Sequence, residues 1–430
     1  MLRKLFMPGL HLKRWVFLIV LGFLSLMLFF IIAFGREILL LFAALDRQVN
    51  TFFHLSVGQY SPRIILLLFL FFIGLISIVL GLKHLIRRFV HYVAPEKRGR
   101  IAHLIFKSSE LNKGKNIVVI GGGTGLNSLL SGLKKYTNNI TAIITVADEG
   151  KSSRVMRTEY GVLPPGDIRN CIVALSDAEP LMAKLLQYRF NEGTFKGHPI
   201  GNMLLTAMAK VTGSFEKGVE ETAKIFAIRG RVLPVSLGTT HLCAELENGK
   251  LICEEPEVEE HKKKYKSEIK RLFLDPQVSA YEKAVEAIKS ADLVVLGPGS
   301  LYTSILPNIL VKGIPEALRK TRAKLAYVVN VMTQPGETDQ YTAYDHVAKI
   351  EQYLGIGVLD VILINKEKAP EQLYEKYKKA GARRVKSDEQ ELDRLRDFGA
   401  EIVTANLMTK KDLLRHDSDK LAQAVVKLDT

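Results

Sequence analysis

The stretch that most constrains this chain is residues 116–127, NIVVIGGGTGLN, where an apolar run ends directly on glycines. Residues 117–120 are all β-branched and have no polar face, which is typical of a strand buried on both sides of a parallel sheet. The glycines can take positive φ and approach a ligand closely, and residues 128–135 predict the first turns of a helix whose free N–H groups attract anions. We therefore predict an anion site at this turn, with a plain tight turn as the alternative.

Two familiar nucleotide fingerprints do not fit this region. In the dinucleotide pattern G-x-G-x-x-G counted from Gly121, the third glycine falls on Leu126. Residues 150–152, Gly-Lys-Ser, resemble the end of a Walker A loop, but the glycine required five residues earlier is Thr145. The sequence therefore argues against a standard dinucleotide site and against a P-loop.

The positive charge of the chain is concentrated near its N-terminus. Residues 1–115 hold 16 Lys and Arg against 4 Asp and Glu, while the remaining residues hold 44 against 41. This uneven distribution favours anionic lipid headgroups over nucleic acid as the partner of the basic residues. With 430 residues, the chain has room for a membrane part and a large domain.

The three cysteines, Cys171, Cys243 and Cys253, have no C-x-x-C or Cys/His spacing. A zinc site would require such spacing, and disulfide frameworks are typical of small, cysteine-dense secreted domains. We therefore expect neither of them, and a reducing compartment fits.

Two apolar stretches near the N-terminus are each long enough to cross a bilayer. Residues 15–34 and 64–82 carry no charged side chain, and about 20 such residues span the hydrocarbon core. A cleaved signal peptide is the alternative for the first stretch, but a second apolar stretch follows it. We predict a two-span transmembrane hairpin over residues 1–90. Because basic residues flank its outer ends, both termini and the main domain are expected in the cytoplasm. Residues 91–115 then form a basic juxtamembrane linker.

The rest of the chain continues as an α/β pattern. Residues 140–146 predict a second buried strand, and Asp148 follows at its tip, placed to hydrogen-bond a ribose or to hold a divalent cation. A cap of the next turn is the alternative for Asp148. Asp167 is suited to cap a helix over residues 168–175. Arg169 lies in the first turn of that helix, where a cation requires a compensating ligand or carboxylate.

Two further segments differ in character. A helix predicted over residues 200–211 begins just after His198, which could contact an anion or serve as a structural hydrogen-bonding group. Residues 213–275 show short alternating runs, with Asn248-Gly249 as a hairpin signal. We predict a small antiparallel insertion there, with a solvated flap at 254–271.

The parallel pattern resumes with strands predicted at 291–296, 325–329, 361–365 and 401–405. The predicted fold is therefore a doubly wound and mostly parallel α/β sheet with a small antiparallel insertion. In such a sheet the loops after the strands converge on one edge, where ligands bind at the switch in strand order. We predict one ligand site on a rim formed by loops 121–127, 148–154, 297–304 and 330–338.

Six motifs occur in a fixed order: GGGTGLNSLLSGLK, TAIITVAD, PPGDIRNCIVALSD, GHPIGN, ADLVVLGPGSLYTSILPNIL and NVMTQPGETDQYTAYDHV. Together they cover about residues 116–365 and resemble the CofD/YvcK-like family, specifically its bacterial gluconeogenesis-factor branch. The resemblance implies a Rossmann-like domain over residues 116–430. The wider family includes the 2-phospho-lactate transferase of cofactor F420 synthesis, which uses a divalent cation. The gluconeogenesis-factor branch is linked to cell shape and peptidoglycan synthesis, and to binding of nucleotide sugars such as UDP-N-acetylglucosamine.

The chain departs from that branch in two ways. The usual ADDGGSSG is here residues 147–154, ADEGKSSR, so Lys151 and Arg154 replace two glycines. These cations could pair with a diphosphate or block backbone approach to it. The predicted hairpin is also unlike the common soluble members, and it implies a protein held at the inner membrane near cell-wall machinery.

The predicted ligand-binding residues lie on the rim or beside it. They are Gly121, Gly122, Gly123, Thr124, Gly125, Asn127, Asp148, Ser152, Ser153, Asp167, Asn170, His198, Asn202, Gly297, Gly299, Ser300, Tyr302, Thr303, Asn330 and Thr333. The two glycine turns would cradle phosphate, Asp148 would hold ribose or a metal such as Mg²⁺, and Asn330 and Thr333 would orient the ring. No catalytic residue is assigned.

Two functions follow from these expectations. The first is a membrane-tethered regulatory factor of cell shape and cell-wall synthesis under gluconeogenic growth, which binds a UDP-sugar or other nucleotide and contacts a wall-synthesis or signalling protein. The alternative is a Mg²⁺-dependent transferase of the 2-phospho-L-lactate transferase type, with the cation on Asp148 and Asp167. The sequence supplies no evident nucleophile or acid–base pair, which favours the first function. We expect no nucleic-acid partner, and a homo-oligomer is left open.

Overall fold

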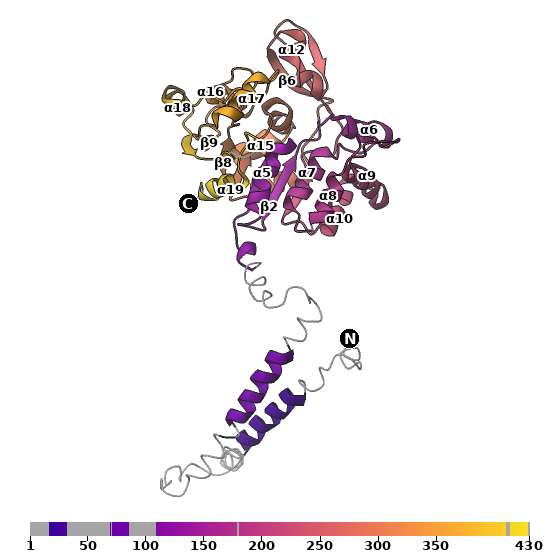
Figure 1. Cartoon of the computed structure of the whole chain (residues 1–430), viewed down its shortest axis with the longest axis vertical. Helices are drawn as coiled ribbons and strands as arrows, with labels where there is room; N and C mark the ends of the chain where they lie inside the picture. Colours follow the sequence, from indigo (N-terminus) through magenta and orange to yellow (C-terminus); the bar gives the residue numbers. More distant parts are fainter. Residues whose placement is uncertain are drawn as a thin grey trace. The chain divides into compact units, whose positions relative to one another are not determined.

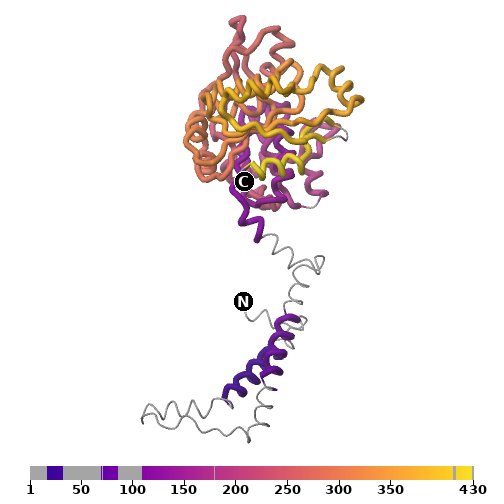
Figure 2. Tube along the Cα trace, turned by 90° about the vertical axis from the view of Figure 1, so that its left-hand side faces the viewer, coloured from indigo at the N-terminus to yellow at the C-terminus, as the bar shows by residue number. Residues whose placement is uncertain are grey.

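The computed structural model describes residues 17–31, 69, 71–85, 109–178, 180–409 and 413–428. The chain divides into two compact units, Met1–Lys107 and Ser108–Thr430. Figures 1 and 2 show both, and each is described here by itself.

In the first unit, residues 17–31 and 71–85 are helical. The two helices approach closely at glycines, since a Cβ atom added to Gly22 would lie 2.8 Å from the carbonyl oxygen of Gly74. The rings of Phe29 and Phe71 are 5.3 Å apart, so the helices run antiparallel. In the parts of the chain that the structure describes, no helix is both long enough and apolar enough to cross a membrane. The spans predicted at 15–34 and 64–82 extend beyond the described residues.

The second unit is built on a seven-stranded sheet in the order β10-β9-β8-β7-β1-β2-β3, with every neighbouring pair parallel. The strands are β1 (Ile117–Gly121), β2 (Ile140–Ile144), β3 (Arg231–Pro234), β7 (Leu293–Leu296), β8 (Lys324–Val328), β9 (Val361–Asn365) and β10 (Glu401–Ala405). All seven overlap a strand or short alternating run predicted from the sequence.

Helices cover both faces of this sheet. They are α5 (Gly123–Leu133), α6 (Lys151–Tyr160), α7 (Gly166–Leu175), α8 (Pro180–Gln187), α9 (Ile200–Thr212), α10 (Phe215–Ile225), α13 (Glu282–Lys289), the π-helix η2 (Leu301–Ile305), α14 (Leu306–Ile309), α15 (Ile314–Lys320), α16 (Ala343–Leu354), α17 (Glu371–Lys379), α18 (Glu389–Arg396) and α19 (Ser418–Lys427). In one group α5 packs against α7 and α19, and in another α15 packs against α13, α14 and α16. Every residue of β1, β2, β7 and β9 is buried, which explains their continuous apolar sequences.

The strand order reverses between β1 and β7. From β1 the chain builds the sheet through β2 to β3, and after β7 it adds β8, β9 and β10 on the opposite side. The loops that follow β1 and β7 therefore lie at this switch point, which is where ligands bind in folds of this kind. The predicted rim is confirmed as one edge of the sheet.

The antiparallel insertion is shorter than predicted. A separate sheet in the order β5-β4-β6 contains β4 (His241–Leu246), β5 (Leu251–Cys253) and β6 (Ile269–Asp275), with α11 (Glu255–Glu259) and α12 (His261–Tyr265) beside it. It stands out from the rest of the unit, where Figure 1 labels β6 and α12. Residues 213–234, assigned to the insertion from their short runs, instead form α10 and the edge strand β3. The prediction was wrong there because an edge strand of four residues has the same short pattern as a hairpin strand.

A disulfide joins Cys243 and Cys253, with their Cα atoms 4.0 Å apart. The two residues are directly opposite each other on the antiparallel strands β4 and β5, where side chains come close in space. The expectation of no disulfide was wrong because a cross-strand pair depends on register and not on a spacing motif. The third cysteine, Cys171, is free and buried in α7.

Candidate functional site

The two glycine turns touch each other at the switch point. A Cβ atom on Gly125 would lie 2.7 Å from the carbonyl oxygen of Pro298, and one on Gly299 would lie 3.3 Å from that of Gly122. The close approach of the two turns therefore requires glycine at position 125 and leaves little room for a side chain at position 299. Helix α5 begins at Gly123, which has φ of +65°, so the glycine turn itself forms the first turn of the helix. The sequence had predicted this helix to start five residues later.

A cavity of about 400 Å³ opens beside these turns, within the size range of small-molecule sites. Six of the predicted ligand-binding residues line it: Thr124, Gly125, Gly299, Ser300, Asn330 and Thr333. We call this cavity the rim pocket. The first turns of α5 form part of its wall, so free helix N–H groups lie close to whatever the pocket holds.

The loop after β8 is held in place by hydrogen bonds to Gly299 and Arg383. Asn330 Nδ2 donates to the Gly299 carbonyl oxygen at 2.8 Å. The Thr333 hydroxyl accepts the Arg383 N–H at 2.9 Å, and Thr333 N–H donates to the Arg383 carbonyl at 2.7 Å. These polar groups hold the walls of the rim pocket in place.

The C-terminal part of the chain supplies a wall of the rim pocket that the sequence did not predict. Tyr377, Leu414, Arg415 and His416 all line the cavity. The Arg415 side chain is exposed, and its guanidinium has no hydrogen bond or ion pair with another described residue. His416 is buried and bonds to the backbone of Val329, and burial lowers its pKa to about 4. His416 therefore stays neutral and anchors the segment that presents Arg415, which is the free cation among the described residues that line the pocket.

The second glycine turn already holds a carboxyl group of the protein itself. One carboxylate oxygen of the fully buried Glu337 accepts the Tyr302 N–H at 2.7 Å and the Ser300 hydroxyl at 2.5 Å. Burial raises the pKa of Glu337 to about 7, and these hydrogen bonds oppose the shift. Tyr302 and Thr303, predicted to contact phosphate directly, are buried around this carboxylate. Their contact with a ligand stays a prediction, but the Tyr302 backbone donor is already taken.

A second internal carboxylate lies at the first glycine turn. The backbone of Gly123 hydrogen-bonds the Asp167 carboxylate, and a Cβ atom on Gly122 would lie 2.5 Å from Asp167 Oδ2. Burial, and next the negative charge of Asp148, raise the pKa of Asp167 to about 7. Asp167 was predicted to cap α7, but it lies within the first turn of that helix, which starts at Gly166 after Pro165. It reaches back to α5 instead.

Asp148 caps the turn that leads into α6, which is the alternative considered from the sequence. Its Oδ1 accepts the Gly150 N–H at 2.9 Å and its Oδ2 accepts the Ser153 hydroxyl at 2.7 Å. A third carboxylate, Glu255 of α11, reaches the same region, where it accepts the Glu149 N–H at 2.7 Å. Burial and then the charge of Asp148 raise the pKa of Glu255 to about 9. We call Asp148, Asp167 and Glu255 the carboxylate cluster.

The family resemblance implies a divalent cation, and the oxygen atoms of the carboxylate cluster are the kind of ligand that such a cation prefers. Mg²⁺ is commonly held by one or two carboxylates together with water and substrate phosphate. Burial, and after it the negative charge of Asp148, raise the pKa of Asp167, and a cation would offset both effects. Among the described residues, however, no three His, Cys, Asp or Glu side chains are arranged to hold a metal ion by themselves. A cation here would need oxygen ligands from a substrate, and Asp148 as a metal ligand stays a prediction.

Four predicted residues form a hydrogen-bonded network beside this cluster. Ser152 Oγ lies 3.1 Å from His198 Nδ1 and accepts from Asn202 Nδ2 at 3.0 Å. Arg169 donates to Asn202 Oδ1 and to Asn170 Oδ1, both at 2.8 Å. Arg169 thus bonds to two amide oxygens. No carboxylate bonds to it among the described residues, so the predicted compensating carboxylate or ligand is not found in direct contact. The network fixes the first turns of α6, α7 and α9 relative to one another.

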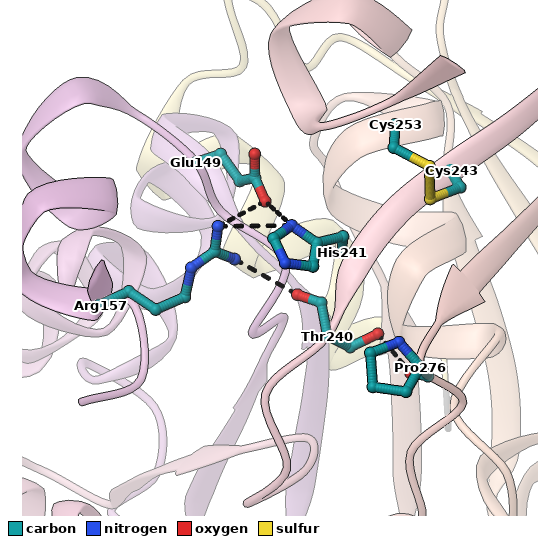
Figure 3. Close-up of a disulfide and its surroundings, with 7 residues drawn as sticks. All are labelled: Glu149, Arg157, Thr240, His241, Cys243, Cys253 and Pro276. Carbon is teal, nitrogen blue, oxygen red and sulfur yellow. Dashed lines mark hydrogen bonds and ion pairs between the residues drawn. A yellow bond between two sulfur atoms is a disulfide. The ribbon is translucent and has the colours of Figure 1, made fainter. Parts of the chain in front are cut away.

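The loop after β2 is clamped to the small sheet (Figure 3). Glu149 Oε1 accepts from Arg157 Nη2 and lies 2.7 Å from His241 Nδ1, while Arg157 Nη1 donates to the Thr240 carbonyl at 3.3 Å. Glu149 and Arg157 are buried, so this ion pair is protected from solvent screening. The clamp holds the small sheet in the position from which Glu255 enters the carboxylate cluster.

The two cations that replace family glycines do not line the rim pocket. Arg154 forms an ion pair with Glu254 just ahead of α11, and Lys151 is exposed at the start of α6. Arg154 therefore contributes to attaching the small sheet. Of the remaining predicted residues, Gly121 ends β1, Gly297 has φ of +76°, and Asn127 Oδ1 is buried without a partner among the described residues.

Comparison with known proteins decides the family. The family model described as 2-phospho-L-lactate transferase CofD matches residues 117–408. This chain belongs to the CofD family. A Bacillus subtilis protein named gluconeogenesis factor is 46% identical over 315 residues, which are 73% of this chain and 97% of that protein. The CofD match ends before Leu414, Arg415 and His416, so this part of the pocket wall lies outside the matched region, while Tyr377 lies within it.

Two further proteins are similar to this chain. A Clostridium acetobutylicum protein, provisionally named a gluconeogenesis factor, is 42% identical over 424 residues, or 97% of this chain and 90% of that protein. That relative therefore also spans the N-terminal unit. A crystal structure of a UPF0052-family protein from Bacillus halodurans has a TM-score of 0.69 and 44% identity, covering 73% of this chain and 99% of that one. Because its whole chain matches so large a part of this one, the α/β unit folds there without an N-terminal unit.

Proposed function

We propose that this protein is a membrane-tethered regulatory factor that binds a UDP-sugar in the rim pocket and controls cell-wall synthesis and cell shape during gluconeogenic growth. The name shared by relatives that are 42% and 46% identical supports the gluconeogenic context. Binding would be read by a wall-synthesis or signalling protein at the inner face of the membrane.

The observation that carries this proposal is the combination of Arg415 with the start of α5 across one cavity of about 400 Å³. A diphosphate placed between them would meet a free guanidinium on one side and helix N–H groups on the other, the two donors that proteins use most often for phosphate. The Tyr377 ring, on the same wall as Arg415, offers a flat surface to a base or a sugar.

The tether is supported by the surface of the first unit. Large apolar side chains point outward on both described helices, for example Phe17 (66% exposed), Phe23 (65%) and Phe72 (53%). Close helix approach through glycine, as at Gly22 and Gly74, is common between helices in lipid. With basic residues at the outer ends of the apolar stretches, both termini and the α/β unit would lie in the cytoplasm.

The test is calorimetric titration of the fragment 108–430 with UDP-N-acetylglucosamine, with and without Mg²⁺, followed by analysis of the recovered ligand. Saturable binding with the ligand returned intact is expected. No binding would refute the proposed ligand, and chemically altered ligand would refute the regulatory role in favour of catalysis.

A transferase is the second candidate, and the carboxylate cluster is the observation that favours it. The pKa of Asp167 is raised to about 7 partly by the charge of Asp148, and strongly shifted carboxylates are typical of functional sites. In such an enzyme Asp148 and Asp167 would hold Mg²⁺, which would stabilise negative charge on a transferred phosphoryl group. The residues of this chain would position the phosphate and exclude water, and Asp148→Asn would abolish Mg²⁺-dependent turnover.

A further inference from the structure

We propose that the Cys243–Cys253 disulfide is a redox switch, in which a dithiol reductant attacks Cys253 and thereby releases Glu255 from the carboxylate cluster. The bond joins β4 to β5 beside the clamp drawn in Figure 3. Disulfides in reducing compartments usually serve catalysis or redox sensing, and this argument alone rests on the proposed cytoplasmic location. The switch is separate from the rim pocket, and no step of it depends on the ligand proposed there.

The two cysteines of the disulfide differ in access. Cys243 lies on the central strand of the small sheet and is 1% exposed, whereas Cys253 is exposed and ends the edge strand β5. A thiolate attacks a disulfide at a sulfur atom that it can reach. A reductant therefore forms its mixed disulfide with Cys253, and the thiolate of Cys243 is the leaving group.

The exchange uses both thiols of one dithiol reductant. The first thiolate bonds to Cys253 Sγ and breaks the bond to Cys243 Sγ, which leaves with the electron pair and takes up a proton. The second thiolate then attacks the reductant's own sulfur in the mixed disulfide, so Cys253 Sγ leaves and is protonated in turn. Two electrons and two protons pass to the protein, the reductant becomes a disulfide, and an oxidised dithiol reverses the reaction.

The residue directly after Cys253 has a strained backbone. Glu254 has φ of +84° and ψ of 137°, close to a region that almost only glycine occupies and that persists where surrounding contacts enforce it. On one side the disulfide fixes Cys253, and the Glu254 N–H donates to the Leu242 carbonyl at 2.9 Å. On the other side the fully buried Val258 anchors α11. Breaking the disulfide removes one of these constraints, so that Glu254 can relax.

Strand β5 is weakly attached without the disulfide. It has three residues, forms one edge of its sheet and pairs with β4 alone. Ile252 is buried, but Leu251 is 64% exposed. Segments with few buried apolar contacts open locally at low cost in free energy. Reduction therefore frees residues 251–255, while α11 stays anchored beyond them.

Two side chains beside the disulfide connect the small sheet to the main sheet. Glu254 forms an ion pair with Arg154 of α6, and the Glu255 carboxylate accepts the Glu149 N–H at 2.7 Å. Glu149 also bonds to His241 of β4. Both strands that the disulfide joins therefore meet the loop after β2. The oxidised protein holds the three carboxylates of the carboxylate cluster together, and reduction releases one of them.

The first test compares amide hydrogen exchange of fragment 108–430 in its oxidised form and after reduction with dithiothreitol, without ligand. Reduction should accelerate exchange by about fivefold or more over residues 251–259 and at the Glu149 amide, because these bonds lose a local constraint. Exchange in β1 and β7 should not change. The matched control is the double variant C243S/C253S, which should exchange like the reduced wild type with or without dithiothreitol.

Two substitutions of Glu254 separate the backbone strain from the ion pair. Glu254→Gly and Glu254→Ala both remove the pair with Arg154, but glycine adopts φ of +84° without strain and alanine does not. The acceleration caused by reduction should therefore be smaller in Glu254→Gly than in Glu254→Ala, by about fivefold or more. Equal acceleration in the two variants would contradict the role given to Glu254.

Single cysteine variants test which sulfur atom is attacked. Both C243S and C253S lack the disulfide, so they differ in which thiol remains. Cys253 in C243S should form a mixed disulfide with glutathione disulfide about tenfold faster or more than Cys243 in C253S, because exposure governs the reaction. Mass spectrometry measures both rates. Equal rates, or a faster reaction of Cys243, would contradict attack at Cys253.

Three further results would overturn the proposal. They are three free thiols in the aerobically purified fragment, unchanged exchange over residues 251–259 after reduction, and accelerated exchange throughout the unit, which would make the disulfide a global constraint instead of a local switch. The binding of UDP-N-acetylglucosamine is measured separately on the oxidised fragment. A failure of the switch is therefore distinguishable from a failure of the proposed function.

Discussion

Glu337 accepts the backbone N–H of Tyr302 at 2.7 Å, at the turn where the sequence predicts the phosphate of a ligand. The carboxylate thus satisfies with a protein group the N–H that a bound anion would otherwise use. A ligand phosphate is left with Arg415 and with those N–H groups at the start of α5 that do not face Asp167, since the Gly123 backbone already bonds that carboxylate. The hydrogen bond between Glu337 and Tyr302 therefore favours the first glycine turn, and not the second, as the site of a bound phosphate.

Replacing Glu337 by glutamine should change how stability depends on pH. The pKa of Glu337 in the folded protein, about 7, lies above the usual value of 4.5. Its favourable contribution is therefore complete below pH 4.5 and is lost as pH rises through 7, because ionising the buried group costs free energy. The wild type should lose on the order of 3 kcal/mol of unfolding free energy from this group across that range. Glu337→Gln should not show this part of the loss.

Urea denaturation at pH 5 and pH 8 measures the effect. The matched control is Glu371→Gln on the exposed side of α17, which should keep the wild-type dependence. An unchanged pH dependence in Glu337→Gln would contradict the assignment of a buried, hard-to-ionise carboxylate.

Asp148→Asn should remove proton release on Mg²⁺ binding. A cation between Asp148 and Asp167 favours the ionised form of Asp167, whose pKa is about 7, so binding near pH 7 should release protons from the wild type. Titrations with Mg²⁺ in two buffers of different ionisation enthalpy count the protons. Glu159→Gln, at an exposed position of α6, should release as many as the wild type. Release that persists in Asp148→Asn would mean that the cation binds elsewhere.

The disulfide predicts the number of reactive thiols. Fragment 108–430 unfolded in guanidinium without reductant should expose one thiol, that of Cys171, and three after reduction. Reduction should also lower the free energy of unfolding by about 3 kcal/mol, because the bond closes a short loop with a sequence separation of 10. Three thiols in the unreduced protein would show that Cys243 and Cys253 are reduced, as the expected compartment requires.

The parallel sheet could be predicted from the sequence because its strands are buried on both faces. Continuous apolar runs such as Ile117–Ile120 and Val361–Ile364 have no other common explanation in a chain with glycine turns after them. The position of Asp148 at the tip of β2 followed from the same pattern. The short edge strand β3 could not be separated from the insertion, since an edge strand carries a weaker pattern.

Only part of the lining of the rim pocket could be predicted from the sequence. Thr124, Gly299 and Asn330 follow directly after strands, so the geometry of the sheet brings them together. Tyr377 and Arg415 come from segments with no glycine turn and no strand just before them, and only the three-dimensional packing places them at the pocket. Glu255 reaches the site in the same way, through contacts far apart in sequence, whereas Glu337 lies on the predicted rim loop 330–338 but was not named among the site residues.

The most direct test of the UDP-sugar proposal compares two ligands on one variant. Arg415→Met should weaken UDP-N-acetylglucosamine binding to fragment 108–430 by about 10- to 100-fold, the range for a hydrogen bond to a charged group, and leave uridine binding unchanged. Arg322→Met, at an exposed position just before β8 and thus at the opposite edge of the sheet, should bind both ligands like the wild type. Calorimetric titration gives these affinities. Absence of saturable binding to the wild type, or equal losses for both ligands in Arg415→Met, would contradict a UDP-sugar held by its diphosphate in the rim pocket.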